Sequence, residues 1–252
     1  MQFELLPIID LMLDLYAKPR SVERFNDYLK LLQGDKKGEL AMPISGFNPM
    51  ARVHVLQKLS DLEALNAEQL VQEILLEINK QFADTENKDC FKVAINICDD
   101  LLGSWTNGFT TDFDSKFKLN ALVNRQFCTP IFWTSEEYLI DDEYSTKLIK
   151  ERILESVYRT IYWCSHSKPK TLKEHFDQER FVAQYAKDKY LYTDLDIQFL
   201  KQFYEQHQES EDYHLIFNFF YGDNASDSLA FPCFGIKDDW AGFEYAQFLG
   251  NK

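Results

Sequence analysis

The sequence predicts a mainly α-helical protein, a single domain over residues 1–252 with bundle-like packing of roughly nine helices. Apolar residues recur at helical spacing along most of the chain, and residues typical of helix starts and ends bracket these stretches. With only 9 glycines and 7 prolines, the chain has little of the turn chemistry that an all-β fold requires. No internal repeat, low-complexity tract or flexible linker divides it.

Two helices are expected near the N-terminus. In residues 5–18 polar residues recur every fourth position, as on the narrow solvent-facing stripe of a buried helix, and Pro19 ends the pattern. These polar residues are Asp10, Asp14 and Lys18. The next helix starts at Ser21, a good N-cap residue, and stops before Gly34. Its apolar face would carry Val22, Phe25, Leu29 and Leu32.

Two more helices follow. Asn48 and Pro49 form a favourable N-cap and first-turn pair, which opens one of them. Asn66 and Gln69 match a capping box at the start of the other. Apolar residues then follow at helical spacing: Val71, Ile74, Leu75, Ile78 and Phe82.

The stretch FKVAINICDDLLG, residues 91–103, fits two patterns. Alternate positions are apolar, as in a strand: Phe91, Val93, Ile95 and Ile97. Polar positions recur at helical spacing: Lys92, Asn96, Asp99 and Asp100. The helical pattern accounts for more of the stretch, so we expect a helix. The alternative is an α+β fold in which residues 91–97 and 214–221 form a small sheet.

Helices resume in the second half. Thr134 and Glu137 offer a capping box ahead of an apolar face, and Thr171 and Glu174 offer another. A further helix is expected to begin near TDLD, residues 193–196. Residues 210–222 carry polar side chains at helical spacing, although a short buried strand would also fit. Residues 225–236 are expected to be extended, with a short helix after Asp238 or Asp239.

The charge of the chain excludes two classes of partner. With 41 acidic residues against 27 Lys and Arg, the formal net charge is −14. Nucleic-acid sites need clustered Lys and Arg, and the longest basic run is Lys36–Lys37. We therefore expect no nucleic-acid partner. We also expect no membrane partner, because an anionic bilayer would repel the chain and Asp10 and Asp14 interrupt the N-terminal apolar stretch.

The cysteines indicate a reducing compartment. The five are an odd set without a CxxC pair: Cys90, Cys98, Cys128, Cys164 and Cys233. All but the last lie among apolar or aromatic residues, where free cysteine behaves as a small core side chain. We therefore expect a cytoplasmic protein without disulfides.

No catalytic motif is present. The chain lacks a nucleophile elbow, a phosphate-binding loop and a dinucleotide fingerprint, and its 5 histidines form no metal-binding motif. We predict no cofactor and no metal site. Two carboxylate pairs, Asp99–Asp100 and Asp112-x-Asp114, have a spacing compatible with a divalent cation or acid–base chemistry, and equally with capping of turns.

Residues 103–137 interrupt the helical pattern. Connections of this length are uncommon in compact domains and are often functional. We predict that the segment borders a ligand-binding site, with Arg125 paired to one carboxylate and with Asp99 or Asp100 nearby. The predicted site residues are Trp105, Asn107, Asp112, Asp114 and Arg125. Two ordinary loops around a short helix are the alternative.

The residues identify neither a reaction nor a catalytic side chain. We expect a cytoplasmic ligand-binding or protein-interaction protein, whose target is an unidentified small molecule or protein. The alternative is a hydrolase that uses Asp carboxylates, with or without a divalent cation.

Overall fold

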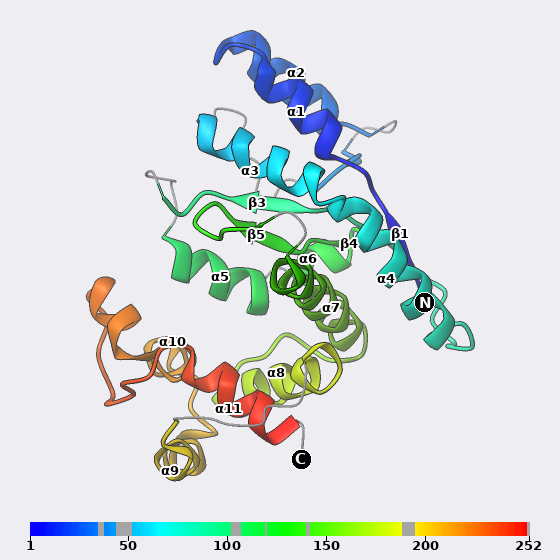
Figure 1. Ribbon diagram of the computed structural model, residues 1–252. Helices are drawn as coiled ribbons and strands as arrows, with labels where there is room; N and C mark the ends of the chain where they lie inside the picture. The colour runs from blue at the N-terminus through cyan, green and yellow to red at the C-terminus, as the bar shows by residue number, and fades with distance from the viewer. Residues whose placement is uncertain are drawn as a thin grey trace. The chain divides into compact units, whose positions relative to one another are not determined.

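The computed structural model describes residues 1–34, 38–43, 52–101, 107–118, 120–139, 142–187 and 195–250. They form a mainly helical protein with a minor parallel β component (Figure 1), so the predicted fold class is confirmed. The chain divides into two compact units that alternate along the sequence. Unit 1 comprises Met1–Gly108 and Ala121–Val157, and unit 2 comprises Phe109–Asn120 and Tyr158–Lys252. The expectation of a single domain stays a prediction.

Unit 1 is built around short parallel strands. One sheet has the order β1-β2-β4, with strands β1 (Gln2–Leu5), β2 (Cys90–Val93) and β4 (Phe127–Cys128). A second sheet pairs β3 (Asn96–Cys98) with β5 (Ile131–Trp133). Parallel strands are normally covered on both faces and so are apolar throughout. Every residue of β3, β4 and the last two of β5 is buried.

A proline explains why there are two sheets instead of one. Lys92 of β2 pairs with Phe127 of β4, and Asn96 of β3 pairs with Ile131 of β5. The two pairs have the same separation in sequence, so the β3–β5 ladder continues the register of the β2–β4 ladder. Pro130 lies at the interruption and has no N–H to donate. Its carbonyl still accepts a hydrogen bond of 2.9 Å from the backbone N–H of Asn96, which keeps the two chain segments in register.

The helix that we predicted over residues 91–103 is wrong in its described part, which holds β2 and β3. Parallel pairing with β1 on one side and β4 on the other decides the conformation, and no local spacing reveals such partners. The alternative sheet is correct for residues 91–97. It is wrong for residues 214–221, which are helical as first expected.

Four helices of unit 1 precede β2 in the described part of the sequence. They are α1 (Ile9–Ala17), α2 (Val22–Leu32), α3 (Val53–Ala64) and α4 (Ala67–Gln81). Helix α4 packs against β1, α3 against β3, and α1 against both α2 and α3. Ser21 caps α2 as predicted, its side chain accepting a hydrogen bond from the backbone N–H of Arg24.

Two predicted helix starts need comment. Asn66 adopts a left-handed conformation with φ of 51° and its side chain makes no cap hydrogen bond, so the capping box predicted there is wrong. Asn48 and Pro49 lie outside the described residues. Thr134 is likewise no N-cap, because it continues the ladder of β5 through a hydrogen bond of 3.0 Å to the Cys98 carbonyl.

Each boundary between the units falls within a helix. The helices are α5 (Gly108–Phe117), the short α6 (Asn120–Val123) and α7 (Glu143–Ser165). Unit 2 continues with α8 (Leu172–Ala186), α9 (Ile197–His207), α10 (Tyr213–Ser228) and α11 (Ala241–Gly250). Helix α11 packs against α8, α9 and α10. The capping box of Thr171 with Glu174 is confirmed at the start of α8.

The core of unit 2 is rich in aromatic side chains. Its fully buried rings include Phe113, Phe117, Phe176, Phe217, Phe219, Phe220 and Tyr221. Many of them meet edge-on or tilted, the arrangements that ring quadrupoles favour. A large part of the high Phe and Tyr content therefore serves packing.

Helix α10 contains a sharp kink. Gly222 has φ of 80° and ψ of 176°, and the backbone N–H of Asp223 bonds to the Ile236 carbonyl at 2.7 Å. The Asp223 carboxylate accepts hydrogen bonds from the backbone N–H groups of Phe234 and Gly235. The helix resumes beyond the kink through Ser228, so the prediction of extended chain from residue 225 is wrong for its first four residues, 225–228.

Candidate functional site

The four predicted site residues that the structure describes divide between the two units. Trp105 lies outside the described residues. Asn107 and Arg125 are exposed and belong to unit 1, whereas Asp112 and Asp114 lie on α5 in unit 2. The prediction that they line one concavity is therefore still a prediction.

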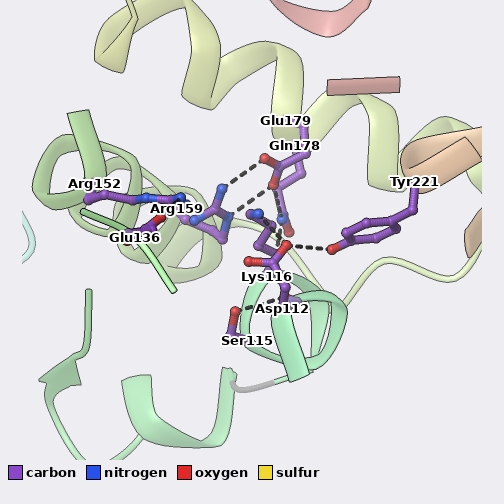
Figure 2. A network of polar contacts seen from close by, with 9 residues as sticks. All are labelled: Asp112, Ser115, Lys116, Glu136, Arg152, Arg159, Gln178, Glu179 and Tyr221. Carbon is purple, nitrogen blue, oxygen red and sulfur yellow. Dashed lines mark hydrogen bonds and ion pairs between the residues drawn. The ribbon is translucent and has the colours of Figure 1, made fainter. Parts of the chain in front are cut away.

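Asp112 is buried and forms an ion pair with Lys116, one helical turn further on (Figure 2). The hydroxyl of Tyr221 donates a hydrogen bond of 2.6 Å to the same carboxylate oxygen. The expected pairing of Arg125 with one carboxylate stays a prediction, and for Asp112 the partner is Lys116. Burial and the adjacent Asp112 carboxylate together raise the pKa of Tyr221 well above its ordinary value. Asp114, by contrast, is 49% exposed in its side chain and pairs with Lys118 at 2.7 Å.

A buried polar network extends from this pair within unit 2 (Figure 2). Arg159 donates from Nε and Nη2 to the two carboxylate oxygens of Glu179, at 3.0 and 2.8 Å. The Gln178 side chain donates to Glu179 and to the backbone carbonyl of Lys116, both at 2.8 Å. The network thus ties α5 to α8 and to the C-terminal part of α7. Because its carboxylates are already paired with cations, we interpret it as structural.

Unit 1 contains a separate polar group at the carboxyl ends of β3 and β5. Asp100 accepts hydrogen bonds of 2.9 Å from the Thr134 hydroxyl and from the Ser135 backbone N–H. Asp99 lies 2.8 Å from Nε2 of His54, near the start of α3. The carboxyl ends of parallel strands are the usual place for ligand sites in open sheets. Within the described ranges, no three metal-ligating side chains converge.

A cavity of about 610 Å³ adjoins this polar group, because His54 lines it. Among the described residues, nine line the cavity; five of them are basic and none is acidic, the basic ones being Lys18, Arg20, Arg24, Arg52 and His54. The rest of the wall is aromatic or aliphatic, from Tyr16, Pro19, Val53 and Leu56. In a chain with 27 Lys and Arg among 252 residues and a net charge of −14, this concentration of cations is the main anomaly of unit 1.

The local sequence explains how these cations gather. Helix α1 ends at Ala17, ahead of Pro19, so Lys18 and Arg20 occupy the turn into α2. Arg24, only 3% exposed, lies on the inner face of α2 with its guanidinium 4.7 Å from the centre of the Tyr16 ring. It donates a hydrogen bond of 3.2 Å to the Lys18 carbonyl, beyond the end of α1. Burial lowers the pKa of Arg24 and raises that of Tyr16.

The cavity keeps part of this positive charge unneutralised. Asp27 pairs with Lys18 at 2.7 Å and with Lys30 at 3.0 Å. In the described parts of the chain, Arg20 and Arg52 form no ion pair, and both are exposed. This site contains no run of consecutive basic residues, so it was not predicted from the sequence. The relevant signal is two spaced groups, at residues 18–24 and 52–54, which the fold brings together.

Together, the fold and this site define a mainly helical protein with a small parallel β component and a basic cavity. No protein-family model, no curated protein and no solved structure matches the chain in the comparisons made with them. The function is therefore argued from the residues and their geometry.

Proposed function

We propose that the protein binds a ligand that carries both an anionic and an apolar group, and that it does so in the basic cavity of unit 1. The observation that carries this proposal is the concentration of basic side chains, without a carboxylate, around a cavity in an acidic chain. Exposed Arg20 and Arg52 supply charge for the anionic group. Tyr16, Val53 and Leu56 supply an apolar wall for the remainder of the ligand.

The segment 103–137 keeps a role in this proposal. Its residues Thr134 and Ser135 donate hydrogen bonds to Asp100, and the neighbouring Asp99 lies 2.8 Å from Nε2 of His54, which lines the cavity. The end of the segment thus supports the site indirectly. Its earlier residues Asp112 and Asp114, which we had considered as ligand contacts, are paired with lysines in unit 2.

A cytoplasmic location and the absence of a nucleic-acid partner belong to the same proposal. The net charge of −14 and the absence of disulfides among the five cysteines, all of which are described, support it. No helix in the described ranges combines the length and the apolar character needed to cross a membrane.

The proposal can be tested by calorimetric titration of the full chain with three probes: inorganic phosphate, pyrophosphate and decanoate. We expect binding of at least one probe, and we expect the Arg20→Gln/Arg52→Gln variant to bind it at least about tenfold more weakly, or about 1.4 kcal/mol. Arg125→Gln is the matched control, because Arg125 is an exposed arginine of unit 1 outside the cavity. Equal binding by all three proteins, or a loss with Arg125→Gln alone, would contradict the proposal.

A second candidate function is hydrolysis, which the contact between His54 and Asp99 favours. An imidazole close to a carboxylate and beside a cavity is a common arrangement for a general base. The test is the rate at which the full chain hydrolyses p-nitrophenyl phosphate and p-nitrophenyl acetate. Activity that falls at least about a hundredfold in both His54→Asn and Asp99→Asn would support this function. Activity that is absent, or unchanged in these variants, would exclude it for these substrates.

A further inference from the structure

Helix α2 exposes an apolar stripe. Val22, Phe25 and Leu29 are 70%, 42% and 39% exposed and follow one another at i, i+3 and i+7, on one face of the helix. We had predicted that they form the buried face together with Leu32, but only Leu32 is buried. The inner face of α2 is formed by Arg24 and Tyr28 with Leu32, so this helix turns an arginine inward and a row of large apolar side chains outward.

The stripe begins two residues after the cavity lining in the chain. Lys18, Pro19 and Arg20 line the cavity immediately before α2, and Val22 follows two residues later. Val53, which also lines the cavity, is 80% exposed. One surface therefore combines an apolar row with an arginine-rich hollow, which we call the α2 surface: Arg20, Val22, Phe25, Leu29, Arg52 and Val53.

We propose that the α2 surface binds an acidic amphipathic helix of another protein; this inference rests on the proposed function and names its ligand. Apolar anchors at i, i+3 and i+7 are the spacing by which one helix recognises another. The row from Val22 to Leu29 covers eight residues of α2, a rise of about 10 Å, which matches about two turns of a partner helix. Acidic side chains flanking the partner's apolar face would meet Arg20 and Arg52 at the cavity.

Charge also decides between a partner and a second copy of this chain. A second copy would bring its own net charge of −14 to the encounter, which opposes association of two such chains. A partner needs to be acidic only over the segment that docks. Complementary charge at the cavity rim would then accelerate association and select against basic helices.

The experiment is a display selection on the immobilised full chain. The library presents one helix of a fixed small scaffold with eight randomised surface positions, and the Val22→Ser/Phe25→Ser/Leu29→Ser variant is used for counter-selection. We expect the enriched helices to carry apolar residues at i, i+3 or i+4, and i+7 with Asp or Glu beside them. Fluorescence anisotropy of an enriched helix should show at least tenfold weaker binding to the triple variant and to Arg20→Gln/Arg52→Gln. Binding to the Arg20→Gln/Arg52→Gln variant should also lose its salt dependence.

Leu76→Ser is the matched control, because Leu76 is an exposed leucine of α4 outside the α2 surface. It should bind the helix like the unmodified chain, and the triple variant should keep its far-ultraviolet circular dichroism and melting temperature. If the serine changes unfold α2, the arginine variant provides the same test.

Several results would overturn the inference. They are enrichment of basic helices, no enrichment over the triple variant, or concentration-dependent dimers in sedimentation that the triple variant abolishes. If phosphate, pyrophosphate or decanoate still binds in an Arg20- and Arg52-dependent manner, only the inference fails and the proposed function remains. If no small probe binds either, both fail.

Discussion

The guanidinium of Arg159 contacts both carboxylate oxygens of Glu179, and both side chains are buried, with 6% and 5% of their side-chain surfaces exposed. Two parallel hydrogen bonds make this the strongest kind of ion-pair geometry. Gln178, the preceding residue of α8, donates a further hydrogen bond to Glu179 and another to the Lys116 carbonyl of α5. The pair therefore lies at the centre of the network that joins three helices of unit 2.

We predict that removing one member of this pair destabilises the protein far more than replacing both. Arg159→Met or Glu179→Met should each lower the free energy of unfolding by about 3–5 kcal/mol, because each leaves a buried charge without its partner. The double variant should lose much less free energy of unfolding than the sum of the two single losses. Urea denaturation of the four proteins measures the coupling. Additive losses would show that the two side chains do not act as a pair.

The two carboxylates of α5 should respond differently to neutralisation. Asp112→Asn removes the buried partner of Lys116, so we expect a loss of about 3–5 kcal/mol in the free energy of unfolding. Asp114→Asn is the matched control and should change stability by no more than about 0.5 kcal/mol, since its side chain is half exposed. Thermal and urea denaturation distinguish the two. A stable Asp112→Asn variant would contradict the structural interpretation of the network.

Tyr221 gives a prediction about pH. Its pKa is raised above the ordinary value of 10.0 in the folded protein, so its contribution to stability is complete below that pH. As the pH rises above 10.0, the unfolded chain ionises this tyrosine while the folded chain does not, and the contribution is lost progressively up to the folded pKa.

The variant Tyr221→Phe isolates this effect from the other buried tyrosines. At neutral pH it should be less stable by about 1–3 kcal/mol, because the Asp112 carboxylate loses a hydrogen-bond donor. Above pH 10 the difference in unfolding free energy between the two proteins should narrow by up to about 1.4 kcal/mol per pH unit. A difference that stays constant with pH would show that Tyr221 titrates normally.

Two glycines with similar φ angles differ in the space around an added Cβ. Gly38 has φ of 86° with nothing near an added Cβ, so Gly38→Ala should lose only about 1–2 kcal/mol from the left-handed conformation. Gly222 has φ of 80°, and an added Cβ would lie 2.5 Å from the Asp238 carbonyl oxygen. Gly222→Ala should therefore lose about 1–3 kcal/mol more. Equal losses, measured by urea denaturation, would show that the segment around Asp238 moves freely.

The sequence predicted the helices whose signals are local. Ser21 and Thr171 mark helix starts by bonding to backbone groups within three residues, and both predictions are confirmed. At Asn66 the same kind of pattern gave a wrong prediction of a capping box. This residue is left-handed, and its side chain makes no cap hydrogen bond. For β2 and β3 the determining contacts come from distant strands, which local periodicity does not record.

The candidate site was not predicted from the sequence, because its contacts also join residues that are distant in the chain. Asp112 looks like a residue of an exposed turn until Tyr221, 109 positions away, is seen to donate to it. Arg20 and Arg52 are isolated in the sequence and become neighbours only through the packing of α1 against α2 and α3. The apolar spacing of α2 was correctly recognised, but spacing alone does not say whether a face meets the core or a partner.

The alternation of the two units along the chain has a consequence for biosynthesis. Because β4 and β5 of unit 1 follow the first segment of unit 2, its sheets cannot be completed until the ribosome has passed Trp133, and the whole unit not until it has passed Val157. The N-terminal helices, which surround the basic cavity, are made long before that point and must wait for the strands beneath them. A single cut in the gene also cannot separate the units, since the chain passes from one to the other after Gly108, after Asn120 and after Val157. Any attempt to produce unit 1 alone would have to rejoin its two segments in place of residues 109–120.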